Sequence, residues 1–503
     1  MKKIPVLGVL AALCLSSCAV GPDFERPEAP AAATAYTAEP IPEVSESADI
    51  PGGAAQRFLA GQDIPGDWWK LFRSDAINKM VERAIRANAS LAAAQATLRQ
   101  SAYLLRAQAG TFLPTVDAQG TVQRAKTSSI FGPSTNTSFG AVLGFSYVLD
   151  IFGGNRRQFE AVGAQEDYEH FQLEGTFLSL VSNVIVASID LASLRAQIAV
   201  TEDIIKSQTQ ELDLLNQQFQ LGAVAKGDVL AQQAQLAQTQ ATLPPLEKQL
   251  AQVRNAISVL LGRLPSEDQI DEISLDTLYL PQDIPLSVPA KLVDQRPDVR
   301  ASEALLHQAS AQVGVATAAM LPQIQLSGNY SSNAANVGDL FTASPSNITW
   351  SLLGSVTQPI FHGGELWFRR RAAQAAYDAA AGQYRNTVLT AFSDVATALR
   401  TLELDAEALK IQLEAERSAR ENFEITRERF RAGAISYLSM LDAERVDQQA
   451  RILLVQAQAN RFADTVQLFQ ALGGGWWNRD DRGPATEEEA RDAADTLATT
   501  GAR

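Results

Sequence analysis

The sequence is poor in the residues that build catalytic and cofactor sites. It has two cysteines, three histidines and four methionines in 503 residues. The histidines, His170, His307 and His362, are scattered, and the chain contains no HExxH, CxxC pair, phosphate-binding glycine loop or GxSxG motif. We therefore expect no catalytic residue, no metal site and no cofactor, and the pattern argues against an enzyme. Polar positions in helices or corners explain these histidines better than ligand roles.

Positive charge and long apolar runs are also scarce. The net charge of −15 argues against nucleic acid as a partner. Beyond the N-terminus no stretch reaches 18 consecutive apolar residues, so the sequence predicts no transmembrane helix. If the mature chain crosses a membrane, it must then do so as a closed β-barrel. The acidic C-terminal tail, residues 475–503, lacks an apolar period, and we expect it to be disordered.

The N-terminus has the features of a targeting segment. Lys2 and Lys3 precede a short apolar run that ends in "LSSC", which resembles a bacterial lipobox. We expect residues 1–17 to be a signal peptide that is cleaved before Cys18, whose thiol then carries a covalent lipid. The alternative is an ordinary signal peptide with an incidental cysteine. Because Cys14 leaves with the signal peptide, the mature chain is expected to have no disulfide.

The chain contains an internal repeat. "DIFGGNRRQF" at residues 150–159 resembles "PIFHGGELWF" at 359–368, about 209 residues later, and "FQLGA" at 219–223 resembles "FRAGA" at 430–434. Each half reads as a helix, two strands, a long helix, a glycine turn and a returning helix. The predicted parts are an N-terminal extended segment, two repeats and a linker between them (residues 18–66, 67–264, 296–474 and 265–295).

Four segments alternate between apolar or small residues and polar ones (residues 116–122, 139–149, 324–330 and 348–356). Period two over this length fits strands of a membrane barrel, and it fits equally a water-soluble sheet with one face on a core. Polar, hairpin-like linkers join each pair (residues 124–136 and 332–346). Because the smallest barrels have about eight strands, four strands require copies of the chain to pool theirs. Two, three or four chains would supply about eight, twelve or sixteen strands.

The remaining segments have helical periodicity. Residues 155–220 lack proline and carry a heptad of apolar residues, which the second half repeats (Leu191, Ile198, Ile205, Leu212 and Phe219; Leu402, Leu409, Phe423 and Phe430). A helix of this length is a rod of roughly 100 Å. Two shorter helices, at residues 75–110 and 226–261, are expected to pair along it, the second kinked at Pro244 and Pro245. A plain coiled-coil bundle without a pore is the alternative, and it leaves the strands unexplained.

Several longer motifs carry a family resemblance. They are "CAVGPDFERPEAP" at 18–30, "DWWKLFRSDAINKMVERAIRANASLAAAQATLRQS" at 67–101, "IPLSVPAKLVDQRPDVRASEALL" at 284–306 and "RFRAGAISYLSMLDAER" at 429–445. In this order they resemble the outer membrane efflux proteins, which are TolC-like, and more closely the NodT/OprM-type lipoprotein subgroup. The resemblance extends from Cys18 to about Trp477.

The resemblance implies a mainly α protein with a membrane β-barrel. Three chains would share a twelve-stranded barrel in the cell outer membrane and an α-helical tunnel across the periplasm, with an equatorial belt from residues 271–296 and the chain after Leu472. This lipid-anchored homotrimer would dock on an inner-membrane pump through a periplasmic adaptor. The implied function is the exit duct of a tripartite efflux pump, of resistance–nodulation–division type, for small toxic molecules or drugs. Heavy-metal efflux, type I secretion and a non-channel structural envelope lipoprotein are the alternatives.

Glycines mark two kinds of turn. Two glycine pairs lie where strand turns into helix, and there the backbone must turn without a side-chain clash (Gly153, Gly154, Gly363 and Gly364). Gly222 and Gly433 let the chain reverse at the predicted tips. The resemblance implies that the adaptor contacts the tips (Leu221, Gly222, Ala223, Gly433, Ala434 and Ile435), although these residues are also suited to tight turns alone.

By the same resemblance, Leu438, Asp442 and Arg445 map onto a periplasmic aperture, with Asp228 from the other tip. The spacing of the first three places them on one helix face. Three copies would form a hydrophobic ring of Leu438 and an acidic ring of Asp442, with Arg445 available to pair with a carboxylate. A carboxylate near the start of a helix can also simply favour that terminus. More distant relatives use Arg and Asp where this chain has Ile435 and Ser439, so their latch does not carry over.

Overall fold

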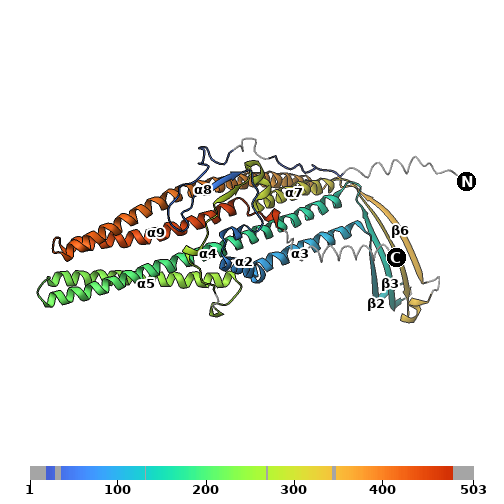
Figure 1. The fold of residues 1–503 in the computed structure, drawn as a ribbon. Coiled ribbons are helices and arrows are strands. Elements are labelled where there is room, and N and C mark those ends of the chain that lie inside the picture. Colours follow the sequence, from blue (N-terminus) through green and yellow to red (C-terminus); the bar gives the residue numbers. More distant parts are fainter. Residues whose placement is uncertain (1–18, 29–34, 131, 268–269, 343–346, 480–503) are drawn as a thin grey trace. The chain divides into compact units, whose positions relative to one another are not determined.

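The computed structural model describes residues 19–28, 35–130, 132–267, 270–342 and 347–479. The chain forms two compact units, and each takes segments from both sequence repeats. Unit 1 comprises the described parts of Met1–Pro27, Ala96–His170 and Ala301–Asn386, and unit 2 those of Glu28–Gln95, Phe171–Arg300 and Thr387–Arg503. Most of the described chain is helical (Figure 1).

Unit 1 contains a four-stranded antiparallel sheet in the order β2-β3-β5-β6 (Thr115–Ser129, Gly132–Leu149, Gln323–Ala334 and Ile348–Thr357). The four predicted strands are confirmed, and β2, β3 and β5 are longer than predicted. The prediction of a polar linker at residues 124–136 is wrong, because these residues extend β2 and β3, with Arg124 opposite Thr137 and Lys126 opposite Thr135. Threonine favours strands, and its polarity hid this extension in the sequence.

The register of the sheet puts the predicted apolar set on one face. Val116 lies opposite Phe145, Leu143 opposite Tyr330, and Tyr330 opposite Trp350. Directly opposed residues of an antiparallel pair point to the same side. The other face is polar: the Gln325 amide donates to the Ser146 hydroxyl at 3.0 Å, and the Ser351 hydroxyl donates to the Asn329 side chain.

The corresponding helices of the two halves have equal lengths. Helices α4 (Gly154–Gln220) and α8 (Glu365–Arg431) have 67 residues each, and the returning helices α5 (Lys226–Leu260) and α9 (Tyr437–Ala471) have 35 each. Helices α8 and α9 begin 211 residues after α4 and α5, respectively. Helix α5 continues through Pro244 and Pro245, whose places in α9 are taken by Val455 and Gln456.

The first predicted helix is interrupted. Instead of one helix over 75–110, the chain forms α2 (Asp75–Ala87) and α3 (Ala89–Ala109), and Asn88 between them is extended. The Asn88 side chain accepts a hydrogen bond from the Leu91 N–H at 3.0 Å and donates to the Leu260 carbonyl at 3.0 Å. Asparagine caps helices well, so a new helix starts here. The second repeat has α7 (Pro297–Ala318) before its strands.

The core of unit 2 includes parts of the predicted extended segment and of the predicted linker, together with the start of the first repeat. Strand β1 (Arg57–Ala60) pairs in parallel with β4 (Asp283–Leu286). Trp68 is buried and stacks on Phe469 with ring centroids 5.1 Å apart. Residues 475–479, where the predicted tail begins, contact this unit: Trp476 Nε1 donates to the Gln295 carbonyl at 2.7 Å. The rest of the predicted tail lies outside the described residues.

Among the described residues, one helix, α4, is by length and composition able to cross a membrane, whereas the sequence reading expected none. Within the structure, 67% of its apolar window is buried. A buried core helix passes the same test, so this is weak evidence for a membrane span.

Candidate functional site: the helix tips and the apolar sheet

The two tips are built from the same turn. Gly222 and Gly433 have φ of 76° and 72°, in the left-handed region that favours glycine. At the first tip the Gly222 N–H donates to the Phe219 carbonyl at 2.9 Å and the Ala223 N–H to the Gln218 carbonyl at 2.9 Å. At the second tip Gly433 and Ala434 repeat both bonds, to Phe430 at 2.8 Å and Arg429 at 2.9 Å. This pair of bonds is the Schellman motif, which uses the last free carbonyls of the helix.

A small apolar cluster lies behind the tips. Leu215 of α4 and Tyr437 and Met440 of α9 are buried, and partly buried side chains from α5, α8, α9 and the first turn pack against them (Val224, Val229, Ala231, Phe423, Phe430 and Leu441). The Tyr437 hydroxyl donates to the Gln232 side chain, which links α9 to α5. The tip glycines themselves have open space around them, with no atom within 4 Å of an added Cβ. The contact surface predicted at the tips is therefore supported from behind by packed side chains.

The three predicted aperture residues of α9 are exposed on one face. Leu438 is 68% exposed. Arg445 Nη2 lies 2.9 Å from Asp442 Oδ1, in an ion pair whose side chains are 68% and 61% exposed. Solvent screens a pair this exposed, so it contributes little to stability, and both charges stay available to a neighbour.

The two tip carboxylates differ in their local contacts. Asp228 Oδ2 accepts a hydrogen bond from the Ala225 N–H at 3.2 Å, so it occupies the first turn of α5 as a capping side chain. At the second tip Ser436 takes the capping role, accepting from the Ser439 N–H at 3.3 Å. Asp442 lies one turn further along and bonds to Arg445 instead. The sequence reading treated Asp228 and Asp442 as alike and did not identify Ser436.

Buried acids lie above the tip in α9. Glu444 is 3% exposed, and burial, together with the nearby Glu211 carboxylate, raises its pKa to about 7. Burial likewise raises the pKa of Glu211, which the charges of Arg427 and Arg431 partly offset. The sequence reading missed both residues, because an acid in a helix is usually solvated.

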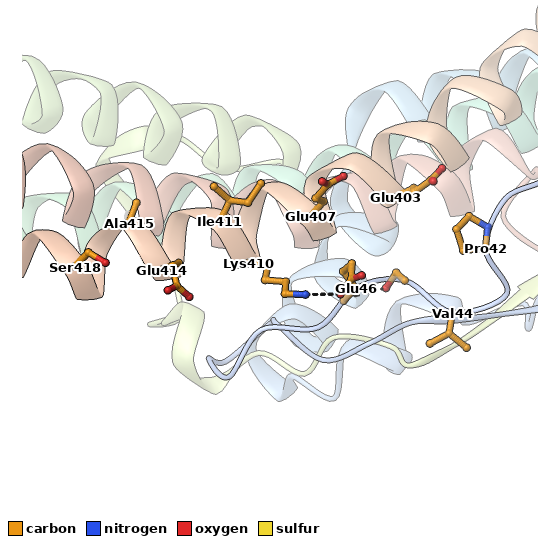
Figure 2. Close-up of a pocket in the computed structure, with 11 residues that line it drawn as sticks. Pro42, Val44, Glu46, Glu403, Glu407, Lys410, Ile411, Glu414, Ala415 and Ser418 are labelled. Atoms are coloured by element: carbon orange, nitrogen blue, oxygen red, sulfur yellow. Dashed lines mark hydrogen bonds and ion pairs between the residues drawn. The ribbon is translucent and has the colours of Figure 1, made fainter.

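Two grooves run along the helices of unit 2. One, of about 390 Å³, lies above the second tip and is lined mostly by uncharged polar side chains, with Arg445 at its edge (it also includes Thr201, Gln235, Thr239, Gln448 and Gln456). The other, of about 670 Å³, lies between α8 and the N-terminal segment. Figure 2 shows its lining, with Lys410 turned toward Glu46, 2.9 Å away, among Glu403, Glu407 and Glu414. None of the predicted site residues lines this second groove.

The first strand-to-helix corner holds the N-terminal segment. Gly153 has φ of 77°, and an added Cβ would lie 2.6 Å from Ala19 Cα. The Val20 N–H donates to the Phe152 carbonyl at 3.0 Å. Arg157 is 4% exposed and lies 2.6 Å from Asp23 and 2.8 Å from Glu160. Cys18 itself lies outside the described residues, so its lipidation stays a prediction.

The second corner uses both glycines, Gly363 and Gly364, with φ of 58° and 86°. At the first corner Gly154 has an ordinary backbone, and Asp150 caps α4 by accepting from the Asn155 and Arg156 N–H groups at 3.0 and 2.9 Å. The two glycine pairs were thus predicted to share one role, and three of the four glycines have positive φ.

In the described parts of the chain, the histidines form no site with other metal ligands. His307 stacks on Phe24 with ring centroids 4.4 Å apart, and its Nε2 lies 2.9 Å from Glu160 Oε1. Among the residues that the structure describes, no group of three His, Cys, Asp or Glu side chains is placed to hold a metal ion.

Comparison with known proteins identifies the family. The sequence profile of the outer membrane efflux protein family matches residues 80–263 and 288–474. The chain belongs to the outer membrane efflux protein family. It is 30% identical over 456 residues to the pyoverdine export outer membrane protein OpmQ of Pseudomonas putida, covering 87% of this chain and 94% of that one. It is 29% identical over 488 residues to outer membrane protein OprJ of Pseudomonas aeruginosa, covering 95% and 97%.

Solved structures of this family share the fold. The outer-membrane channel OprN is 27% identical, covers 91% of this chain and 100% of its own, and superposes with a TM-score of 0.81. The Campylobacter jejuni CmeC outer membrane channel also gives 0.81, covering 94% and 98%; at 24% identity it supports the fold alone. This member of the family is therefore an outer membrane protein that acts in efflux.

Proposed function

We propose that the chain is the exit duct of a tripartite efflux pump, a homotrimer that carries small toxic molecules through the periplasm and the outer membrane. One observation carries the proposal: a sheet with an apolar outer face and two free edges is followed directly by paired helices of 67 residues. The family description and the relatives named as efflux pump outer membrane proteins support it. The proposal assigns no catalysis and no cofactor to the chain.

The free edges of the sheet support a barrel shared between chains. Strands β2 and β6 each pair with one neighbour within the chain, and exposed edges of this kind invite pairing with another copy. A lipid-embedded edge would leave backbone groups unsatisfied, so the barrel must close. Three copies would close it with twelve strands, β6 of one chain beside β2 of the next.

A second seam on α8 supports contact between copies along the helices. Leu402 and Leu409 are buried within the chain, while Leu404, Ile411 and Ile425, also at heptad spacing, are 53%, 57% and 50% exposed. An exposed heptad seam seeks a partner helix. In the proposed trimer, the neighbouring chain covers this seam.

The tips are proposed to gate the duct and to receive the adaptor. Leu438 and Asp442 would face the axis as hydrophobic and acidic rings. The groove of about 390 Å³ above the second tip, with its mostly uncharged polar lining, suits the approach of a helical hairpin from the adaptor. The lipid on Cys18 would hold the trimer in the outer membrane, next to the corner where Ala19 and Val20 are bound.

Relatives suggest the cargo class. Among them are proteins named for antibiotic, toluene and pyoverdine export, which favours small molecules over secreted proteins. Heavy-metal efflux and type I secretion stay as alternatives, as does a structural envelope lipoprotein without a pore. Conductance of the purified protein in liposomes separates a duct from the structural alternative.

The aperture is tested by single-channel recording in planar bilayers. Replacing Asp442→Asn together with Arg445→Gln removes the proposed charged ring, so conductance should rise and cation preference should fall. Asp213→Asn, an exposed acid on α4, is the matched control and should change neither. Unaltered conductance and selectivity in the double variant would refute the aperture assignment.

Asp228→Asn separates the two predictions for that residue. A change in conductance would place Asp228 in the aperture. A loss of helix stability with unchanged conductance would assign it to capping α5, the role that we favour from its bond to the Ala225 N–H.

A further inference from the structure

The strands and hairpins of unit 1 contain few charged residues, and the basic ones lie close together. Residues 115–149 and 323–357 contain four charged side chains: Asp117, Arg124, Lys126 and Asp339. Both basic residues lie in one strand, β2, two positions apart, and therefore on one face.

The register places these cations directly beyond the apolar band. On β3 the apolar face extends from Leu149 to Phe139, and the row of Phe139 and Val122 is the last apolar one. The next row on this face is Arg124 with Thr137, and the row after it is Lys126 with Thr135. The face therefore changes from apolar to basic within one row.

The dimensions match a bilayer. Ten residues of strand span about 33 Å, and a tilt of about 45° reduces this to a height of about 24 Å. That height equals the apolar band of membrane barrels, about 25 Å. Arg124 begins one row further, about 5 Å higher, at the level of lipid headgroups.

The leaflet follows from the topology. The opposite ends of the strands lead into α4 and α8, the helices assigned to the periplasm, so the β2–β3 hairpin lies toward the cell exterior. The exterior leaflet of an outer membrane consists of glycolipid that carries phosphate groups on its sugars. Cations at this height therefore face phosphates.

The protein supplies no competing partner at this level. Arg124 and Lys126 are exposed, and neither makes an ion pair within the described parts of the chain. Their cross-strand neighbours, Thr137 and Thr135, are uncharged hydrogen-bonding residues. Asp339, in the short helix Val337–Phe341 between β5 and β6, is the acid of the other hairpin, and the Asn336 side chain donates to it at 3.2 Å.

We propose that Arg124 and Lys126 bind the sugar phosphates of the outer-leaflet glycolipid, one site on each protomer. The proposal rests on the proposed outer-membrane function, since it requires the sheet to stand in that membrane. Arg124 offers a planar fork of donors to phosphate oxygens, Lys126 adds a point charge, and the threonine hydroxyls complete the contact. The apolar rows below receive the acyl chains of the same lipid, so one molecule is held at both ends.

The test is native mass spectrometry of the full-length trimer in detergent with added diphosphoryl lipid A. We expect the wild type to retain the lipid and the Arg124→Gln/Lys126→Gln variant to bind it about 30-fold more weakly, since each basic residue near an anionic surface contributes about fivefold in affinity. Lipid A without phosphates and phosphatidylethanolamine are the companion probes. Both proteins should retain these two equally.

Two control variants keep the test decisive. Lys206→Gln/Lys248→Gln removes two exposed cations from α4 and α5 and should bind like the wild type. Arg124→Lys/Lys126→Arg keeps both charges and should restore most of the binding. The proposal would be overturned if the Arg124→Gln/Lys126→Gln variant retained diphosphoryl lipid A as well as the wild type does. It would also be overturned if the wild type retained the dephosphorylated lipid as well as it retains diphosphoryl lipid A.

Failure of this proposal is distinguishable from failure of the proposed function. Single-channel conductance of the Arg124→Gln/Lys126→Gln variant should equal that of the wild type, because the two side chains face lipid and not the lumen. A conducting trimer without phosphate preference would refute only the proposed lipid site. A wild-type protein without a conducting pore would refute the proposed duct function.

Discussion

Helices α5 and α9 have the same length and follow the same Schellman turn, yet they are buried to different degrees. Within the described chain, five residues of α5 are buried against seventeen of α9. Helix α9 is therefore the returning helix that packs into unit 2, and α5 keeps most of its surface for other contacts. Duplication preserved the backbone, and the side chains then diverged.

The divergence includes buried charged residues, which are present among the buried residues of α9 and not among those described for α5. Arg461 is 1% exposed and donates to the Leu402 carbonyl at 2.8 Å and the Ser45 hydroxyl at 2.8 Å; the corresponding residue of α5, 211 positions earlier, is Leu250. Glu444 corresponds to Gln233 of α5. Copying the α5 residue into α9 at these places tests whether the difference is structural.

The largest effect is expected from Arg461→Leu. The change removes two hydrogen bonds from a charged donor, one to the buried Leu402 carbonyl and one to the Ser45 hydroxyl, at a loss of about 4 kcal/mol in the free energy of unfolding. Burial lowers the pKa of Arg461 to about 10, so the side chain stays charged at neutral pH. Denaturant unfolding followed by circular dichroism measures the loss.

Arg451→Leu is the matched control in the same helix. Its side chain is 26% exposed and lies 4.0 Å from Asp203, so we expect a loss under about 1 kcal/mol. Equal losses in the two variants would show that burial of Arg461 does not distinguish α9 from α5.

The next largest effect is expected from Glu444→Gln, which should give a pH-dependent gain in stability. The folded pKa of about 7 lies above the ordinary value of 4.5, so the folded state binds the proton more tightly and loses stability as pH rises from about 4.5 to about 7. Glutamine removes this loss. We expect a stabilisation of about 2 to 3 kcal/mol at pH 8 and almost none at pH 4.5.

Thermal unfolding at several pH values checks this prediction. Glu421→Gln, an exposed acid on α8, is the control and should show no such pH dependence. A gain that is the same at pH 4.5 and pH 8 would mean that the buried carboxylate is not the titrating group.

The smallest effect on stability is expected from substitutions of the tip glycines, which compare the two tips. Gly222→Ala and Gly433→Ala each force an alanine into the left-handed region, and we expect equal losses of about 1 kcal/mol because the turn is the same. Gly382→Ala, in the interior of α8 with open space around it, should instead stabilise by about 0.5 to 1 kcal/mol. Unequal losses at the two tips would break their equivalence.

Much of the fold could be predicted because it rests on local periodicity. The alternation of apolar and polar residues located all four strands and their apolar face, and the absence of proline located α4. The break at Asn88 was missed because the side chain bonds to Leu260, far along the chain, and the extension of β2 through Arg124 and Lys126 was missed because its residues are polar. In α9 a readable signal was present: Tyr437, Met440, Glu444, Asp447 and Leu454 keep heptad spacing through polar residues.

For the candidate site, the sequence alone determined the repeated turns, the common face of Leu438, Asp442 and Arg445, and the apolar side of the strands. These features need only neighbours within a few residues along the chain. Only the tertiary structure decided that Arg157 binds Asp23 and that Glu444 is buried beside Glu211. Desolvation and charge pairing depend on which distant segments exclude water from a side chain, and no local pattern records that.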